Sequence, residues 1–281
     1  MIEVTESRVS ELQEMARRMR LNGLKMALTS GSNGSHLGGS FSCIEIMAVL
    51  YGAVLRIDSQ NPLWEDRDYF LPSKNHCVLA HFPALAEVGY IAEEELFEFQ
   101  KDGGRLTGYP RNPKVGLEYS GGSLGMAISV AIGMALAARE KKRRNRYFVL
   151  MGDGELDEGS VWEAFMAAAQ YKLDNLIVII DRNHLSYDGC TEDIMALEPL
   201  KERVECFGWH AVLVNGHNIG QLLQAFNELQ VGRPNIIIAD TVKGKGVSFM
   251  ENIPSYHHAS ITKEQYETAV DEVEKEDVSL W

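Results

Sequence analysis

Two polar side chains in this sequence are spaced as ligands of one metal ion. Asp153 stands on a tight glycine turn in the segment VLMGDGELDEGSVWEA, directly after an apolar run. Asn183 follows a second apolar run, LIVIID, one strand–helix–strand unit later. A carboxylate, an amide oxygen and a nearby backbone carbonyl, for which Leu185 is the candidate, are hard ligands that suit Mg²⁺ or Ca²⁺. Because such an ion takes its remaining ligands from water and phosphate, the pattern predicts a metal–phosphate site.

The residues around Asp153 support an anion at this turn. Gly152 and Gly154 allow the backbone to approach a ligand closely, and a helix expected to begin near Glu158 directs amide groups toward the same anion. A Gly-Asp-Gly turn alone is a common connection, so the position of Asn183 is what favours the metal. The spacing G-x-G-x-x-x-x-G does not fit a dinucleotide fingerprint, and no P-loop sequence occurs.

To meet at one ion, the two residues must follow adjacent parallel strands. The segment 147–181 is a strand–helix–strand unit whose right-handed crossover leaves its strands parallel. Asp153 and Asn183 then lie at the carboxyl edge of the sheet, where open α/β folds bind ligands. Further apolar runs without polar alternation indicate strands covered on both faces. The expected strands are 69–71, 147–151, 176–181, 210–216 and 235–242, and the helices between them include 160–171, 200–208 and 219–229.

The chain is therefore predicted to be an α/β protein with a doubly wound, mostly parallel sheet and helices on both faces. Residues 1–281 are expected to form a single domain, since no flexible linker or repeat is seen. Residues 30–40 are expected to be a glycine-rich loop before a helix at 43–55. Thr262 and Gln265 fit a capping box that opens a last helix in the acidic tail. An N-terminal helix is predicted from apolar residues at helical spacing: Val9, Leu12, Ala16 and Met19.

The composition excludes several classes of partner. A net charge of −13 over 281 residues argues against nucleic acid, and the one basic cluster, 141–144, is interpreted as a solvated helix end. The longest apolar run, 126–138, is too short to span a bilayer, and the N-terminus shows no signal peptide. Four widely spaced cysteines indicate reduced thiols. A cytoplasmic protein with no membrane or nucleic-acid partner is expected.

Beyond these patterns, the chain resembles a known family. GDGELDEG followed by DRN is similar to the thiamine-diphosphate motif, in which Gly-Asp-Gly precedes an asparagine by about one strand–helix–strand unit. Four further segments resemble the N-terminal, diphosphate-binding half of a transketolase, in the family's order: GSHLGGSFSCIEI, LPSKNHC, GGSLGMAISVAIGMA and TVKGKGVSFMENIPSYHH. The likeness covers nearly all of the chain. It implies the thiamine-diphosphate-binding fold and a transferase that moves a two-carbon ketol unit from a ketose to an aldehyde.

The resemblance implies a role for each matching residue. Asp153, Asn183 and the Leu185 carbonyl hold Mg²⁺ or Ca²⁺ on the diphosphate of thiamine diphosphate. The implied catalytic residues are His36, His76 and His257, of which His36 and His257 reach the substrate. Around the cofactor the resemblance places His76, Gly122, Ser123, Leu124, Gly154, Asn183, Lys243 and His257, with Lys74 as nearby charge. The remaining histidines are expected to be structural: His81, His184, His210, His217 and His258.

A complete transketolase has a further domain, which holds the aminopyrimidine ring with a glutamate. The resemblance to one half therefore implies a split enzyme. Its partner is a separate C-terminal transketolase subunit that carries the pyrimidine-binding glutamate, and an α₂β₂ complex is expected. The cofactor lies between the two subunits, so the chain alone is expected to be inactive.

Two positions depart from the family pattern. Tyr109, in LTGYP, replaces a histidine that helps to hold the donor ketose, and Asn75, in KNH, replaces a glycine. A phenol can hydrogen-bond but does not carry a proton near pH 7 as imidazole does. These departures suggest a specialised pathway with an unusual acceptor. Two alternatives stay open: another thiamine-diphosphate component, such as a 2-oxoacid decarboxylase or dehydrogenase or an acyloin synthase, and a cofactor-free regulatory subunit.

Overall fold

A single parallel sheet organises the fold. The computed structural model describes residues 1–275 of the chain. The sheet has five strands in the order β1-β2-β3-β5-β4, and every neighbouring pair is parallel. The strands are β1 Tyr69–Pro72, β2 Tyr147–Gly152, β3 Leu176–Arg182, β4 His210–Asn215 and β5 Asn235–Asp240. The predicted α/β fold with a parallel sheet is confirmed, and all five strands were expected within two residues of these bounds.

Both faces of the sheet are buried, as the unbroken apolar runs predict. Successive side chains of a strand point to opposite faces. Phe148 and Leu150 of β2 accordingly enter one hydrophobic core, whereas Val149 and Met151 enter a second core on the other face. These residues are all fully buried, so the middle of β2 has no polar side chain on either face. Polar chemistry is left to the strand ends.

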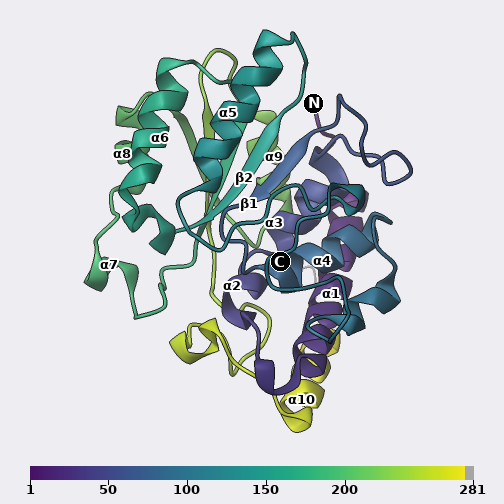
Figure 1. The fold of residues 1–281 in the computed structure, drawn as a ribbon. Coiled ribbons are helices and arrows are strands. Elements are labelled where there is room, and N and C mark those ends of the chain that lie inside the picture. Colours follow the sequence, from purple (N-terminus) through teal and green to yellow (C-terminus); the bar gives the residue numbers. More distant parts are fainter. Residues whose placement is uncertain (276–281) are drawn as a thin grey trace.

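The helices form the layers that cover these two cores. Figure 1 shows α5, α6 and α8 on one side of the sheet and α1, α3 and α4 on the other, where α9 and α10 also pack. The helix bounds are α1 Glu6–Thr29, α2 Leu37–Phe41, α3 Ile44–Val49, α4 Val78–Glu87, α5 Ala127–Glu140, α6 Gly159–Gln170, α7 Thr191–Ile194, α8 Leu200–Cys206, α9 Ile219–Asn227 and α10 Lys263–Lys275.

The glycine-rich segment 30–40 is only partly the loop that its composition predicts. Residues from Leu37 onward form α2, because Leu37 and Phe41 are fully buried in the core and fix a helical turn there. The helix expected at 43–55 is also modified, since α3 ends at Val49 and continues as one π-helical turn, Leu50–Val54. In both cases tertiary packing decides the local structure against the simpler sequence pattern.

The ends of the described chain follow the sequence signals closely. The predicted N-terminal helix is α1, and Thr5 caps it by accepting a hydrogen bond from the Arg8 amide. The capping box at α10 is present: the Gln265 amide donates to the Thr262 hydroxyl, and the Thr262 amide donates to the Gln265 side chain. The last six residues of the acidic tail, 276–281, lie outside the described residues. Among the helices that the structure describes, none is both long and apolar enough to cross a membrane.

Candidate functional site

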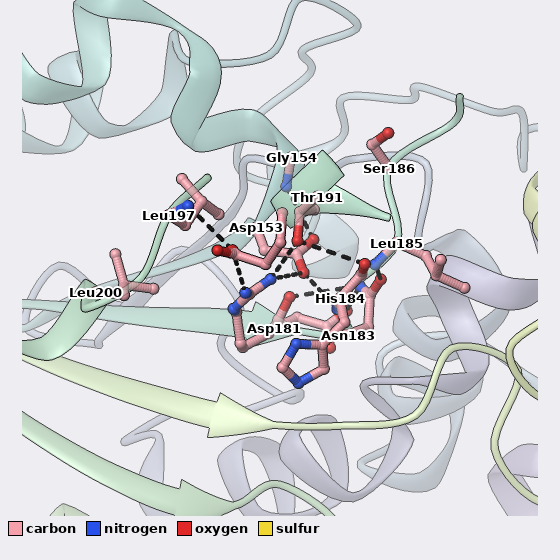
Figure 2. A network of polar contacts seen from close by, with 12 residues as sticks. Asp153, Gly154, Asp181, Asn183, His184, Leu185, Ser186, Thr191, Leu197 and Leu200 are labelled. Carbon is pink, nitrogen blue, oxygen red and sulfur yellow. Dashed lines mark hydrogen bonds and ion pairs between the residues drawn. The ribbon is translucent and has the colours of Figure 1, made fainter. Parts of the chain in front are cut away.

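The predicted metal ligands lie at the carboxyl edge of the sheet, after the adjacent strands β2 and β3. β2 and β3 are hydrogen-bonded neighbours, and Gly152 is in register with Asp181. Asp153 and Asn183 each follow their strand by one residue, as the sequence predicts. Figure 2 shows both side chains in one polar network, together with the backbone of His184 and Leu185. The backbone amide of His184 donates to Asp153 Oδ2 at 2.6 Å, which joins the two strand ends directly.

Asp153 is a buried carboxylate whose ion pair does not fully compensate the cost of its burial. It is 1% exposed, and its Oδ1 accepts from the Gly154 amide at 2.8 Å. Arg182 Nη1 lies 3.1 Å from its Oδ2. Burial and the neighbouring Asp181 nevertheless raise the pKa of Asp153 above its ordinary value, against the lowering effect of Arg182. A divalent cation at this carboxylate would offset that cost, so the donor set fits a metal ion.

The amide of Asn183 is oriented from behind by Asp181. Asn183 Nδ2 donates to Asp181 Oδ2 at 3.2 Å, which leaves Asn183 Oδ1 on the other side, where it accepts from the Leu185 amide at 3.2 Å. Asp181 is fully buried and also accepts from Ser42, Thr241 and Lys74. Burial alone would raise the pKa of Asp181, but Lys74 outweighs it and lowers that pKa. Lys74, expected near the cofactor, thus has its ammonium on Asp181.

The Leu185 carbonyl accepts a hydrogen bond from the ammonium group of Lys243. Lys243 Nζ donates to Leu185 O at 2.7 Å and to Ser186 O at 3.0 Å, and it lies 3.0 Å from His257 Nδ1. Burial and the charge of Lys74 lower the pKa of Lys243 to about 8. The third predicted metal ligand, the Leu185 carbonyl oxygen, is therefore hydrogen-bonded to a positively charged group in this structure. Across the described residues, no group of three or more His, Cys, Asp or Glu side chains could hold a metal, so any ion here depends on the amide and carbonyl oxygens.

Four histidine rings gather beside Lys243. His36 lies with its ring centroid 5.0 Å from that of His76, 5.5 Å from His257 and 4.5 Å from His258. Burial and neighbouring positive charge lower the pKa of His36 to about 4 and that of His257 to about 3, and the pKa of His76 falls well below its usual range. These three imidazoles are neutral at pH 7, so each offers one donor and one acceptor. His258 was expected to be structural, and the structure adds it to the cluster.

The remaining predicted residues lie on a long irregular segment before α5. Gly122 and Ser123 are exposed, Leu124 is half-buried, and Tyr109 is 44% exposed. Among the described residues, no ring contact joins Tyr109 to the histidines. The end of this segment contacts the turn after Asp153, where the Gly125 amide donates to Glu155 Oε1 at 2.7 Å.

Three functional residues escaped the sequence analysis. Glu155 also accepts from Ser73 and from the Gly152 amide, so one buried carboxylate holds three loops of the site together. Arg182 links Asp153 to the segment after β3 through Thr191, Glu192 and Glu198. Asp181 orients Asn183. Glu155 follows the Gly-Asp-Gly turn directly and could have been suspected from that position, whereas Asp181 and Arg182 give no signal in one sequence.

Asn75 has an unusual environment for a polar residue. It is 3% exposed, and its Nδ2 has no hydrogen-bond partner among the described residues. Buried donors in native proteins are normally paired, so this one calls for an explanation. Asn75 directly precedes His76 in the sequence, so this unused donor belongs to the segment that carries one ring of the histidine cluster.

Comparison with known proteins places this geometry in one family. The family model described as "Transketolase, thiamine diphosphate binding domain" matches residues 12–273. A protein of Phocaeicola vulgatus that is named as one subunit of an apulose-4-phosphate transketolase is 41% identical over 265 residues, which cover 94% of this chain and 93% of that protein. "6-deoxy-6-sulfo-D-fructose transketolase subunit SqwG" of a Clostridium species is 40% identical over 244 residues, covering 86% of this chain and 89% of the relative.

Longer relatives match through one part only. Human transketolase is 35% identical over 269 residues, which are 95% of this chain and 43% of the human protein. The solved transketolase of Campylobacter jejuni superposes with a TM-score of 0.86 at 28% identity, again over 95% of this chain and 43% of that one. The transketolase of Leishmania mexicana gives a TM-score of 0.84 at 27% identity and is covered to 42%. The chain thus spans less than half the length of these larger proteins.

Proposed function

Because this chain belongs to the transketolase family, by its thiamine-diphosphate-binding domain, we propose that it is one subunit of a two-component enzyme that moves a two-carbon ketol unit from a ketose donor to an aldehyde acceptor. The relatives that match over most of their own length are named as transketolase subunits, and they bear out the transketolase-type transfer and the split organisation expected from the sequence. Residues 1–281 act in this proposal as a single diphosphate-binding domain.

The proposal assigns thiamine diphosphate and Mg²⁺ to the carboxyl edge of the sheet. Asp153, Asn183 and the Leu185 carbonyl would hold the ion, and Gly154 would let the diphosphate approach the turn. When bound, thiamine diphosphate supplies a nucleophilic carbon that also accepts the negative charge of the ketol fragment. The further residues that would contact the cofactor are His76, Lys243, His257 and the loop of Gly122, Ser123 and Leu124, with Lys74 acting through Asp181.

The histidine cluster would handle the substrate. Because His36 and His257 are neutral at pH 7, each can accept a hydrogen bond from one hydroxyl and donate to another. This pattern suits a ketose, whose adjacent hydroxyl groups must be oriented while one of them gives up a proton. His76, whose pKa the charge of Lys74 helps to lower, is the member of the cluster that would orient the donor near the cofactor.

A partner subunit completes the proposed site. A separate C-terminal transketolase subunit would supply the pyrimidine-binding glutamate, in an α₂β₂ assembly with the cofactor between the subunits. The names of the relatives support a partner, since each is called one subunit of its enzyme. The four cysteines, all free thiols in the structure, are compatible with the proposed cytoplasmic location.

The substrates are proposed to be specialised ones. Two relatives are named for apulose 4-phosphate and for 6-deoxy-6-sulfo-D-fructose. We propose that the donor or acceptor of this enzyme differs from the substrates of common transketolases. Tyr109 supports this, because a tyrosine at that position cannot take the proton-carrying role of the family's histidine.

One observation carries the proposal: Asp153, a buried carboxylate with a raised pKa, and Asn183, an amide oriented by Asp181, follow neighbouring parallel strands in a chain of this family. Calorimetry with thiamine diphosphate and Mg²⁺, on the chain combined with its partner, tests it. Binding that requires the metal is expected, and no binding would favour a cofactor-free regulatory role.

Activity measurements distinguish the remaining alternatives. The chain alone is expected to give no turnover, and the two subunits together are expected to transfer the two-carbon unit of a ketose phosphate to an aldehyde acceptor. A donor screen that includes pyruvate separates this reaction from a 2-oxoacid decarboxylase. Turnover by the isolated chain would contradict the split site, and a preference for pyruvate would contradict the transketolase-type reaction.

A further inference from the structure

A buried ionic network lies behind the loop that carries Lys243. Arg20 of α1 pairs with Glu45 of α3, with Nη2 2.6 Å from Oε1. Glu45 Oε2 lies 2.8 Å from Nδ1 of His217, which stands on the turn between β4 and α9. Arg20 and Glu45 are fully buried and His217 is 7% exposed. The three side chains come from distant parts of the sequence, and none of them has a part in the proposed chemistry.

Both ends of this network reach the same short loop. Nε2 of His217 accepts from the Val242 amide at 2.8 Å, and Nε of Arg20 donates to the Lys245 carbonyl at 3.1 Å. Lys243 lies between these two attachment points. Its own backbone carbonyl accepts from the Asn252 amide at 2.8 Å, so the main chain around Lys243 is held on several sides.

The hydrogen bonds fix the chemical form of His217. A backbone amide can only donate, so Nε2 must be the acceptor and carry no proton. The proton of the neutral ring is then on Nδ1, where it donates to Glu45. Arg20 in turn keeps Glu45 ionised: burial would raise the pKa of Glu45, but Arg20 and His217 outweigh it and lower that pKa to about 2. Each member of the network is thereby fixed by the next.

The loop is shaped to pack against this network. Gly246 has φ +86°, and a Cβ there would lie 2.7 Å from Arg20 Nε, so only glycine allows the contact. Beyond the loop, Lys243 Nζ makes its three short contacts with Leu185, Ser186 and His257. A flexible four-carbon side chain can keep three such contacts together only if its backbone is fixed.

We propose that Arg20, Glu45 and His217 form a clamp on residues 242–245 that positions Lys243 for the cofactor's diphosphate, with His217 as its central positioning residue. The inference depends on the proposed function in one respect: it takes Lys243 as a contact of the diphosphate. His217, expected from the sequence to be structural, thus acts on the site through the backbone amide of Val242 without touching the ligand.

Hydrogen–deuterium exchange on the full-length chain tests the clamp without any cofactor. In a His217→Leu variant, exchange in the peptide spanning 242–247 is expected to be about tenfold faster, since the Val242 amide loses its acceptor. A His217→Gln variant can still accept from Val242 and donate to Glu45, so it is expected to keep most of the protection. The matched control is His81→Leu: His81 is equally buried, bonded to Tyr51 at 2.8 Å, and is not part of the clamp.

The outcomes separate positioning from general destabilisation. Faster exchange at 242–247 in the His217→Leu variant alone supports the clamp. Unchanged exchange there, or an equal effect from His81→Leu, would overturn it, and so would a loss of protection in His217→Gln as large as in His217→Leu.

The link to the cofactor is tested on the complex with the partner subunit. The dissociation constant for thiamine diphosphate with Mg²⁺ is expected to rise about tenfold in His217→Leu and to stay at the parent value in His81→Leu, as for residues that orient a ligand contact indirectly. Parent-like affinity in His217→Leu would refute the positioning role. If the parent complex binds no thiamine diphosphate, the proposed function fails, whereas the exchange experiment still decides whether the clamp exists.

Discussion

At the scale of single residues, the charge balance at Asp153 is the most telling feature of the site. A buried carboxylate with a raised pKa costs folding free energy that a bound cation would recover. An Asp153→Asn variant should therefore keep or gain stability in the ligand-free chain, because the neutral amide removes the buried charge. It should also bind thiamine diphosphate with Mg²⁺ at least about 100-fold more weakly, since even indirect contacts of a metal site contribute 10–100-fold.

Thermal unfolding of the chain and calorimetry on the two-subunit complex measure both effects. Asp157→Asn is the matched control, because Asp157 is exposed and lies four residues further along the same turn. Parent-like cofactor affinity in Asp153→Asn would refute the assignment of the metal to this turn.

Asn75 offers a second test at this scale. Within the described part of the chain its buried Nδ2 has no partner, whereas Asn145, equally buried, donates from Nδ2 to the carbonyls of Glu65 and Arg67 at 2.7 Å each. Asn145→Ala is expected to lower the free energy of unfolding by about 2 kcal/mol, and Asn75→Ala by less than about 1 kcal/mol, because only the former leaves paired groups unsatisfied. Urea unfolding of the two variants gives the comparison. Equal losses would show that Asn75 serves the fold and is not kept for a ligand.

The sequence predicts which residues at strand ends belong to the site better than it predicts the residues that orient them. Asp153 and Asn183 could be found because each follows an apolar run, and parallel strands bring such positions together. The orienting role of Asp181 depends on Lys74, Ser42 and Thr241, which reach it from three other segments. Such contacts have no local pattern, so they could not be predicted.

At the scale of elements, the loop 31–36 shows how backbone conformation positions a side chain. Ser35 and Ala259 exchange two backbone hydrogen bonds, of 2.9 and 3.0 Å, which bring His258 beside His36. Gly34 has φ +67° and ψ 179°, a conformation that is essentially restricted to glycine. A Cβ at Gly34 would lie 2.9 Å from His258 Cε1, so the histidine ring occupies the space that a side chain would need.

Two glycines of this loop form a matched pair for mutation. Gly31 also has positive φ, +58°, but nothing lies within 4 Å of its hypothetical Cβ. Gly31→Ala should cost about 1 kcal/mol of unfolding free energy for the left-handed backbone alone. Gly34→Ala should cost about 3 kcal/mol and should also make His258 more reactive toward diethyl pyrocarbonate, because the ring is displaced. Similar losses and unchanged reactivity in the two variants would contradict this account.

The elements themselves were predicted unevenly. Strands buried on both faces read as continuous apolar runs, so all five were located from the sequence. The order that places β5 between β3 and β4 could not be derived, because adjacency in a parallel sheet is decided by helix packing. α2 was missed for a related reason: its glycines disfavour a helix, and only the burial of Leu37 and Phe41 stabilises one.

At the scale of the whole molecule, stability toward acid depends on buried charges such as Glu45. Its pKa is lowered from 4.5 to about 2, so the stabilisation that it contributes is complete above pH 4.5 and is lost as the pH falls toward 2. Between pH 5 and pH 3 this one group accounts for a loss of about 2 kcal/mol. A Glu45→Gln variant should be less stable at pH 7, since Arg20 and His217 lose their anion, and should show a correspondingly flatter pH dependence.

Urea unfolding at several pH values measures the stability of the parent and of the Glu45→Gln variant as a function of pH. Glu267→Gln serves as control, because the side chain of Glu267 is 63% exposed and its ion pair is with Lys263, one helical turn away. Parallel curves for Glu45→Gln and the parent would show that Glu45 is not the titrating group.

The sheet topology has a consequence for how the protein is made. β1 pairs with β2, so Tyr69 can pair only after Tyr147 has been synthesised. Helix α4, the long irregular segment and helix α5 are made between the two strands. At roughly 5–20 residues per second, a ribosome needs several seconds to deliver β2 after β1 has emerged. Throughout that interval both backbone edges of this apolar strand are unpaired, so a chaperone at the exit tunnel, or slow growth at low temperature, should change the fraction of this protein that reaches its native state.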